Sequence, residues 1–118
     1  MQRGEIWHLD LDPAPGNEAN KRRPAVVVSN DRANATATRL GRGVVTVVPV
    51  TSNIAKVYPF QVLLPAATTG LAVDAKAQAE QIRSVATERL LGRLGQVSAV
   101  EMQQLDEALR LHLELWAP

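Results

Sequence analysis

Two short valine-rich runs constrain the fold of this chain more than any other feature. Ala25 to Val28 follows directly on Pro24, and Val44 to Val50 holds five valines in seven residues. Continuous apolar runs of this length, rich in β-branched residues, are typical of strands buried on both faces. The chain has 118 residues, 46% of them hydrophobic, which is enough for one domain with a modest core. We therefore predict a single domain, residues 1–118, built on a small sheet.

Other short strands are predicted before and after these runs. Residues 5–11 alternate, with Trp7, Leu9 and Leu11 on one face, which is the pattern of a half-buried strand. Further strands are expected at residues 60–64, within residues 77–85, and at residues 96–97, where the sheet would close. The chain is thus expected to form five or six short strands.

The connections are predicted from turn-forming residues. Residues 30–38 indicate a turn with one helical turn, and Gly41-Arg42-Gly43 is typical of a hairpin. Thr87 is expected to cap a short helix. Pro49 has no N–H to give to a ladder, so it must lie at a sheet edge or a bulge.

The last element is predicted as an amphipathic helix. Ser98 and Glu101 fit a capping box, and apolar or aromatic residues then recur every three or four positions, at Met102, Leu105, Leu109, His112 and Trp116. Leu111 and Leu115 widen the apolar stripe. The first three residues of the stripe are expected in the core, and the remainder either packs obliquely on it or faces a second subunit.

Charge and composition exclude several classes of protein. The net charge is only +1, although residues 1–61 hold eight Lys or Arg against five Asp or Glu, so an anion site would have to be local. There is no cysteine and there are only two isolated histidines, so we expect no metal and no cofactor. No apolar run matches a membrane span or a signal peptide, and a cytoplasmic protein is expected.

A phosphate site is suggested by the ends of the two valine-rich strands. Pro24 restricts the backbone of Arg23 at the start of one strand, and an arginine held in this way can give two parallel hydrogen bonds to phosphate oxygens. The other strand ends in Thr51-Ser52-Asn53, and antiparallel neighbours would bring this end beside Arg23. The alternatives are a solvated cationic loop and turn formers that bond to their own backbone.

The chain resembles the MazF/PemK-like toxins of bacterial toxin–antitoxin pairs. The resemblance rests on RGEIWHLDLDP, PGNE, RRPAVVVSN, VVPVTSN, YPFQVLL and AEQIRSV, in this order, followed by the terminal helix. It implies a mainly β (α+β) fold, a small SH3-like or CcdB-like β-barrel of five to seven short strands with a C-terminal α-helix. It also implies a homodimeric endoribonuclease, free of metal, that cleaves single-stranded mRNA and is inhibited by a cognate antitoxin protein.

The same resemblance implies roles for individual residues. Arg23 and Thr51 match the family's catalytic pair, and Glu18 matches an acidic residue of the first loop that could accept the 2′-hydroxyl proton. RNA contacts are implied for a further set, Lys21, Arg22, Ser52, Asn53, Lys56, Gln81 and Arg83.

Two departures separate the chain from the PemK branch. Glu80 stands where some members carry an aspartate proposed as a base, but Gln78 and Asn17 replace the arginine and histidine found with it. An Arg-Thr site of the MazF kind therefore fits better. His8 and His112 are expected to be structural.

Two other functions remain open at this point. A gyrase-binding toxin of the CcdB kind would share the fold and use a tryptophan near the C-terminus, as Trp116 invites. A small barrel that binds without catalysis would also share it.

Overall fold

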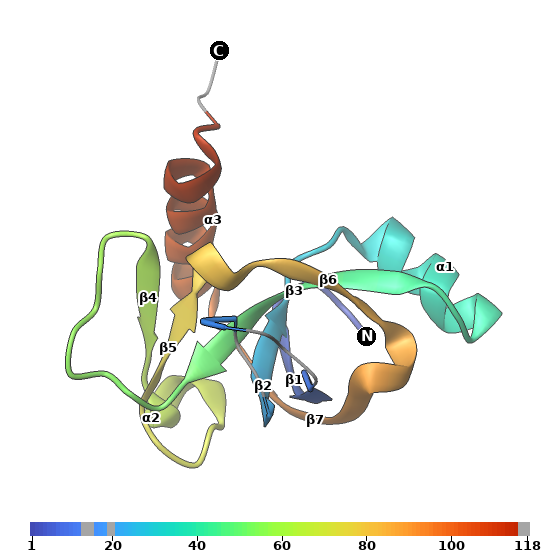
Figure 1. Cartoon of the computed structure of the whole chain (residues 1–118), viewed down its shortest axis with the longest axis horizontal. Helices are drawn as coiled ribbons and strands as arrows, with labels where there is room; N and C mark the ends of the chain where they lie inside the picture. Colours follow the sequence, from blue (N-terminus) through green and yellow to red (C-terminus); the bar gives the residue numbers. More distant parts are fainter. Residues whose placement is uncertain (13–15, 19–20, 116–118) are drawn as a thin grey trace.

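Seven strands and five short or long helical segments make up the described part of the chain. The computed structural model describes residues 1–12, 16–18 and 21–115. In chain order the elements are β1 Glu5–Asp10, β2 Arg22–Val27, α1 Asp31–Leu40, β3 Val44–Thr51, β4 Gln61–Leu64, α2 Ala66–Thr69, β5 Ala75–Gln78, the 3-10 turn η1 Ala79–Gln81, β6 Arg83–Ala86, the 3-10 turn η2 Thr87–Arg89, β7 Leu90–Gln96 and α3 Ala99–Leu113 (Figure 1).

The strands form one curled antiparallel sheet. Its order is β4-β5-β3-β2-β1-β7, and β6 also pairs with β3. β4 and β7 are the ends of this order, so the sheet is open where a closed barrel was expected. The predicted class, a mainly β fold of five to seven strands with a C-terminal helix, is confirmed.

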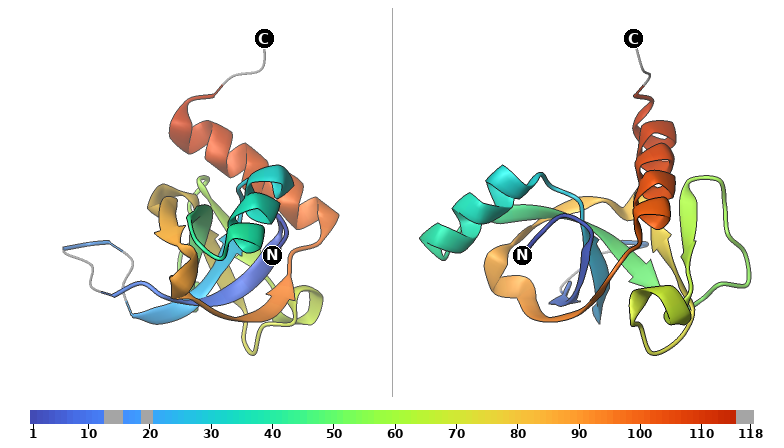
Figure 2. Two further views of the ribbon diagram at one scale, coloured as in Figure 1. Left: turned by 90° about the vertical axis from the view of Figure 1, so that its right-hand side faces the viewer. Right: turned by 180° about the vertical axis from the view of Figure 1, so that it is seen from behind.

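The valine-rich strands are buried on both faces, as predicted. Val26 and Val48 belong to a core cluster covered by Leu105 of α3. The alternate residues, Val27 and Val47, belong to a second cluster that includes Ala37 of α1 and also Leu9 and Leu11. Figure 2 shows α1 and α3 on opposite sides of the molecule in the view from behind. β2 and β3 therefore form the wall between two small cores.

Pro49 lies where β3 changes partners. On one side, β3 pairs with β2 through Pro49 itself, opposite Ala25. On the other side, β6 pairs with β3 as far as Val47, and β5 begins only at Val50. Pro49 falls in the gap between these two pairings, so it pairs with neither β5 nor β6, and no hydrogen bond to these strands is lost through its missing N–H.

Several sequence predictions need correction. Residues 31–40 form a ten-residue helix instead of a single turn, and Gly41, at φ 65°, ends it instead of opening a hairpin. The expected fifth strand is two strands, β5 and β6, separated by η1. The last strand is longer than residues 96–97 suggested. Thr87 is the first residue of η2 and its side chain does not cap it.

The terminal helix begins as predicted. Ser98 accepts a hydrogen bond from the Glu101 N–H, and the Glu101 side chain accepts one from the Ser98 N–H. Leu105 is buried, but His112 is exposed, so the predicted stripe leaves the core before it reaches the histidine. Trp116 lies outside the described residues. None of the described helices has the length and apolar character to cross a membrane.

Candidate functional site

The start of β2 and the end of β3 line one cavity. The register of the two strands pairs Ala25 with Pro49, and its continuation by two residues sets Arg23 across from Thr51. Both residues line a cavity of about 550 Å³, together with Lys21, Arg22 and Ser52. The juxtaposition expected from antiparallel pairing is therefore present in the structure.

Strand pairing and one local hydrogen bond position the two central residues of this cavity. Arg23 is half-buried in β2, opposite Leu9 of β1, and Pro24 is opposite His8. Thr51 is half-buried, and its hydroxyl oxygen accepts a hydrogen bond of 3.3 Å from the Asn53 N–H. That bond uses a lone pair, so the hydroxyl proton can still be donated to a ligand.

Asn53 has a local structural role. Its side-chain oxygen accepts a hydrogen bond of 3.3 Å from the Ala55 N–H. Asn53 and Ser52 are both exposed, and only Ser52 is among the residues that line the cavity of Arg23. The turn-forming alternative thus describes Asn53 and the acceptor side of the Thr51 hydroxyl, and it leaves the Thr51 hydroxyl proton available for a further hydrogen bond.

Glu18, Gln81 and Arg83 line a separate cavity. It has a volume of about 390 Å³ and shares no lining residue with the cavity of Arg23 and Thr51. The Gln81 amide donates a hydrogen bond of 3.1 Å to the Asn17 carbonyl, which attaches the first loop to this side of the sheet. The structure therefore divides the residues of the predicted site between two places.

A polar cluster that the sequence revealed only in part contributes Glu80 and Arg83 to the lining of this second cavity. Gln61 of β4 donates a hydrogen bond of 2.7 Å to Glu80. Gln78 Oε1, Glu80 Oε1 and one terminal guanidinium nitrogen of Arg83 are buried without a partner in the described residues. Gln61 was missed, because a glutamine at the start of a short strand carries no signal until its cross-sheet partner is known.

Lys56 and a buried lysine meet at the β3–β4 loop. The Lys56 ammonium lies 4.7 Å from the centre of the Tyr58 ring, a cation–π distance. Lys76 of β5 is only 7% exposed, and its ammonium donates a hydrogen bond to the Lys56 carbonyl. Lys56 does not line the cavity of Arg23. Lys76 was not predicted from the sequence, because the strand in this region was expected only within residues 77–85.

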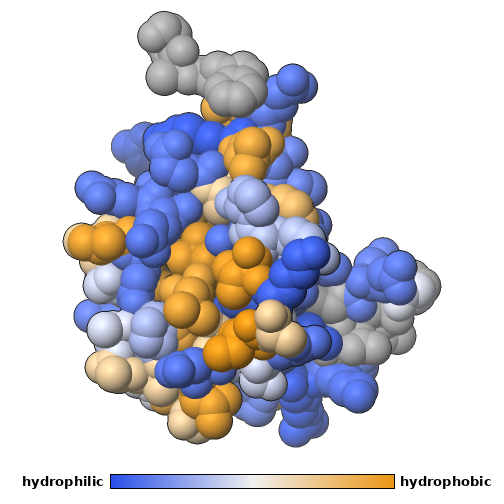
Figure 3. Space-filling view, turned by 90° about the vertical axis from the view of Figure 1, so that its left-hand side faces the viewer, coloured by the Kyte–Doolittle hydropathy of each residue, from blue (hydrophilic) through white to orange (hydrophobic). Residues whose placement is uncertain are grey.

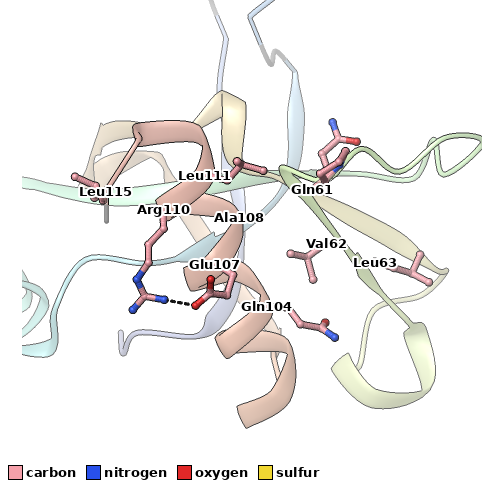
Figure 4. Close-up of a pocket in the computed structure, with 10 residues that line it drawn as sticks. Gln61, Val62, Leu63, Gln104, Glu107, Ala108, Arg110, Leu111 and Leu115 are labelled. Atoms are coloured by element: carbon pink, nitrogen blue, oxygen red, sulfur yellow. Dashed lines mark hydrogen bonds and ion pairs between the residues drawn. The ribbon is translucent and has the colours of Figure 1, made fainter. Parts of the chain in front are cut away.

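A third concavity lies between β4 and α3. Its volume is about 1000 Å³, and its apolar lining includes Val62, Leu63, Ala108, Leu111 and Leu115 (Figure 4). Figure 3 shows apolar side chains gathered on the side of the molecule that carries β4. Leu63, Leu111 and Leu115 are 45–55% exposed. Of the two residues predicted to widen the helical stripe, Leu111 is exposed on α3, whereas Leu115 is exposed beyond the helix, which ends at Leu113.

Comparison with known proteins shows the family of the chain. A sequence model described as the PemK-like, MazF-like toxin of type II toxin–antitoxin systems matches residues 2–113. The chain belongs to this toxin family. It is 80% identical to endoribonuclease MazF9 of Mycobacterium tuberculosis, over 99% of both chains, and 30% identical to endoribonuclease EndoA of Bacillus subtilis, over 98% of this chain and 96% of the relative.

Solved MazF structures share the fold. A crystal structure of MazF from Deinococcus radiodurans superposes with a TM-score of 0.80 at 31% identity, covering 98% of this chain and 97% of that one. A MazE–MazF crystal structure from the same organism superposes with a TM-score of 0.74 at 27% identity, covering 98% and 97%. The family predicted from the motifs is confirmed.

In this MazF-family chain, Glu101 has a shifted pKa and lines neither the cavity of Arg23 nor the cavity of Glu18. Burial alone would raise the pKa of Glu101, but hydrogen bonds from the Ser98 N–H and the Thr68 and Ser98 hydroxyls outweigh it and hold that pKa below its ordinary value.

The described residues contain no group of three or more His, Asp or Glu side chains arranged to hold a metal ion. His8 is half-buried in β1 and lines neither cavity.

Proposed function

We propose that this MazF-family toxin is an endoribonuclease that cleaves single-stranded mRNA without a metal ion. The substrate supplies the nucleophile: its 2′-hydroxyl attacks the adjacent phosphorus, the 5′-oxygen leaves, and the products carry a 2′,3′-cyclic phosphate and a 5′-hydroxyl. Such a reaction asks the protein for in-line positioning and for stabilisation of charge on the phosphoryl oxygens.

The observation that supports this proposal is the pairing of Arg23 and Thr51 in one cavity. Arg23 contributes a fixed positive charge and a planar donor set for two phosphoryl oxygens. Thr51 donates its hydroxyl proton to one of these oxygens, and Ser52 is the adjacent donor. Lys21 and Arg22 line the same cavity, and we assign them to neighbouring phosphates.

The proton acceptor is proposed separately, because its position differs. Glu18 is an exposed carboxylate that can accept the 2′ proton, since an ionised carboxylate only accepts hydrogen bonds. It lies in the cavity of Gln81 and Arg83, away from the Arg23–Thr51 cavity. Because a base must lie within hydrogen-bond distance of the proton it accepts, this role requires the Glu18 carboxylate to reach the nucleotide held by Arg23 and Thr51 when RNA binds. We assign Gln81, Arg83, Asn53 and Lys56 to the flanking nucleotides.

A solved complex of a related toxin supports the partner proposed for this chain. MazF of Deinococcus radiodurans, which is 27% identical to this chain, was crystallised in a MazE–MazF complex. We propose that this chain likewise binds a cognate antitoxin, acts as a homodimer, and works in the cytoplasm, where mRNA is found. The gyrase-binding and non-catalytic alternatives predict no RNA cleavage by the purified protein.

One assay tests this function. Purified protein is incubated with single-stranded RNA in EDTA, and cleavage should persist and leave 2′,3′-cyclic phosphate ends. A 2′-deoxy substitution at the scissile nucleotide should abolish it, and Arg23→Ala and Thr51→Ala should each lower the rate about 10²-fold or more. Cleavage that needs a metal ion, or that continues on the 2′-deoxy substrate, would overturn the mechanism.

A further inference from the structure

The cavity that holds Arg23 and Thr51 has a second, apolar wall. This wall consists of Leu71, Val73 and Leu94, from the α2–β5 connection and from β7. Val73 is 57% exposed and Leu94 is 42% exposed. Large apolar side chains that line a cavity together with cations point to a ligand with an apolar part.

The backbone builds this wall through one close approach. A Cβ atom placed on Gly95 of β7 would lie 2.0 Å from the Thr69 carbonyl oxygen, a distance that no side chain tolerates. Glycine at this position therefore lets β7 touch the end of α2, which brings Leu94 beside the residues after Gly70. Gly70 itself has a φ of 83°, the left-handed conformation that ends α2 and turns the chain toward Leu71.

The connection that carries Leu71 and Val73 is fixed at both ends. The Thr69 hydroxyl donates a hydrogen bond of 2.8 Å to the Pro65 carbonyl and accepts one of 3.3 Å from the Leu71 N–H. Asp74 accepts a hydrogen bond of 2.8 Å from the Ala66 N–H. Leu71 also packs partly on the core cluster that contains Leu105. The wall is therefore held in place before any ligand arrives.

The charges of the cavity restrict what the ligand can be. Its lining contains the three cations Lys21, Arg22 and Arg23, and no Asp or Glu. The fitting ligand is therefore an anion joined to a compact apolar group, and the volume of about 550 Å³ lies in the ordinary range for small-ligand sites. A nucleotide within an RNA strand has this form, with a phosphate at one end and the flat face of a base at the other.

We propose that Leu71, Val73 and Leu94 form a nucleobase subsite beside the scissile phosphate. The base of a nucleotide adjoining the cleaved bond packs its face on this wall while Arg23 and Thr51 hold the phosphate. Aliphatic side chains contact every base face alike, so the subsite reads the presence and size of a base and not its hydrogen-bonding edge. The inference rests on the proposed ribonuclease function and adds to it a group that orients the substrate.

The test couples protein variants to a missing base. RNA substrates carry an abasic ribonucleotide, which keeps the 2′-hydroxyl, at either position flanking the cleaved bond. For wild-type protein, removal of the base at one of these positions should lower kcat/KM about tenfold, the change that corresponds to about 1.4 kcal/mol. Leu94→Asn and Val73→Asn should cleave intact RNA about tenfold more slowly and should lose most of their sensitivity to that same base, because the two losses are not additive.

Leu91→Asn is the matched control, since Leu91 lies on the same strand, is 48% exposed and does not line the cavity. It should behave as wild type, and thermal unfolding checks the fold of all three variants. If Leu94→Asn and Val73→Asn keep full sensitivity to the abasic substitution at both positions, the subsite is overturned while the ribonuclease function stands. If wild-type protein cleaves no RNA at all, the proposed function fails and the subsite fails with it.

Discussion

At the scale of single residues, Glu101 shows how burial and hydrogen bonding combine at a helix start. The residue is 7% exposed, and its two carboxylate oxygens accept hydrogen bonds from the Ser98 N–H and the Thr68 hydroxyl. These bonds favour the ionised form, so the pKa is lower in the folded chain than the ordinary value of 4.5. One side chain thereby caps α3 and attaches it to α2.

This arrangement predicts a pH dependence of stability. A carboxyl whose pKa is lower in the folded state stabilises the fold above its unfolded pKa, and the contribution is lost as the pH falls through the folded pKa. At pH 7, Glu101→Gln should lower the free energy of unfolding by about 1–2 kcal/mol, the usual scale for a lost cap. The difference from wild type should shrink as the pH drops below 4.5, as measured by urea unfolding across pH. Glu107→Gln, at an exposed position on the same helix, is the control, and a difference independent of pH would contradict the assignment.

At the scale of elements, the contact between β7 and α2 gives a prediction with an internal control. Gly95 and Gly92 both lie in β7, but an added Cβ meets the Thr69 carbonyl oxygen only at Gly95 and meets nothing within 4 Å at Gly92. Gly95→Ala should therefore lower the free energy of unfolding by about 1–3 kcal/mol, because the backbone must shift to relieve the overlap. Gly92→Ala should change it by less than about 0.5 kcal/mol. Equal melting temperatures for the two variants would refute this account of the contact.

The β3–β4 loop offers a second prediction at this scale. Lys76, buried in β5 and paired in register with Thr51, supports the loop through its hydrogen bond to the Lys56 carbonyl. Lys76→Met keeps the apolar stem but removes a hydrogen bond from a charged donor, which contributes about 1.5–3 kcal/mol. Tryptic cleavage after Lys56 should become at least about tenfold faster, and Lys76→Arg should restore protection. An unchanged cleavage rate in Lys76→Met would mean that the loop is held by other contacts.

The elements also show what the sequence could and could not predict. The valine-rich strands, the capping box at Ser98 and the approach of Arg23 to Thr51 follow from local pattern and antiparallel pairing, and all were predicted. α1 was underestimated because its buried face consists of Asn34 and Ala37, which give no apolar periodicity. Asn34 is held instead by hydrogen bonds with Ser29. β5 and β6 were merged because the break between them is set by β3, which exchanges one partner for the other.

At the scale of the whole molecule, the candidate site depends on how the sheet is assembled. The Arg23–Thr51 cavity draws on β2, β3, β7 and the α2–β5 connection, and Lys76 and Gln61 contact groups about 20 residues away in sequence. No single segment carries these contacts, so motifs could indicate the central pair but not the apolar wall or the buried lysine. Glu18 and Arg23 line different cavities for a similar reason, since a contact between distant segments places the first loop. Gln81 of η1 donates a hydrogen bond to the Asn17 carbonyl of that loop.

For the whole molecule, the apolar groove between β4 and α3 leads us to predict a homodimer. The groove between β4 and α3 leaves Leu63, Leu111 and Leu115 about half exposed. Burial of such apolar surface normally contributes about 25 cal/mol of favourable free energy per Å². A second copy of the chain could bury this surface by a two-fold contact, and an RNA groove crossing that interface would combine residues of both copies. Sedimentation at micromolar concentration should therefore give a dimer. Leu111→Lys should shift it toward the monomer and lower RNA cleavage, because a charge is placed in an apolar contact.

Leu40→Lys provides the control for that experiment, since Leu40 is 55% exposed at the end of α1 and does not line the groove. It should sediment and cleave as wild type does. A wild-type protein that remains monomeric at micromolar concentration would rule out the homodimer. A Leu111→Lys protein as dimeric as wild type would place the interface on another face, and the apolar surface of α3 would then require a different partner, for which the cognate antitoxin is the first candidate to add to the same sedimentation experiment.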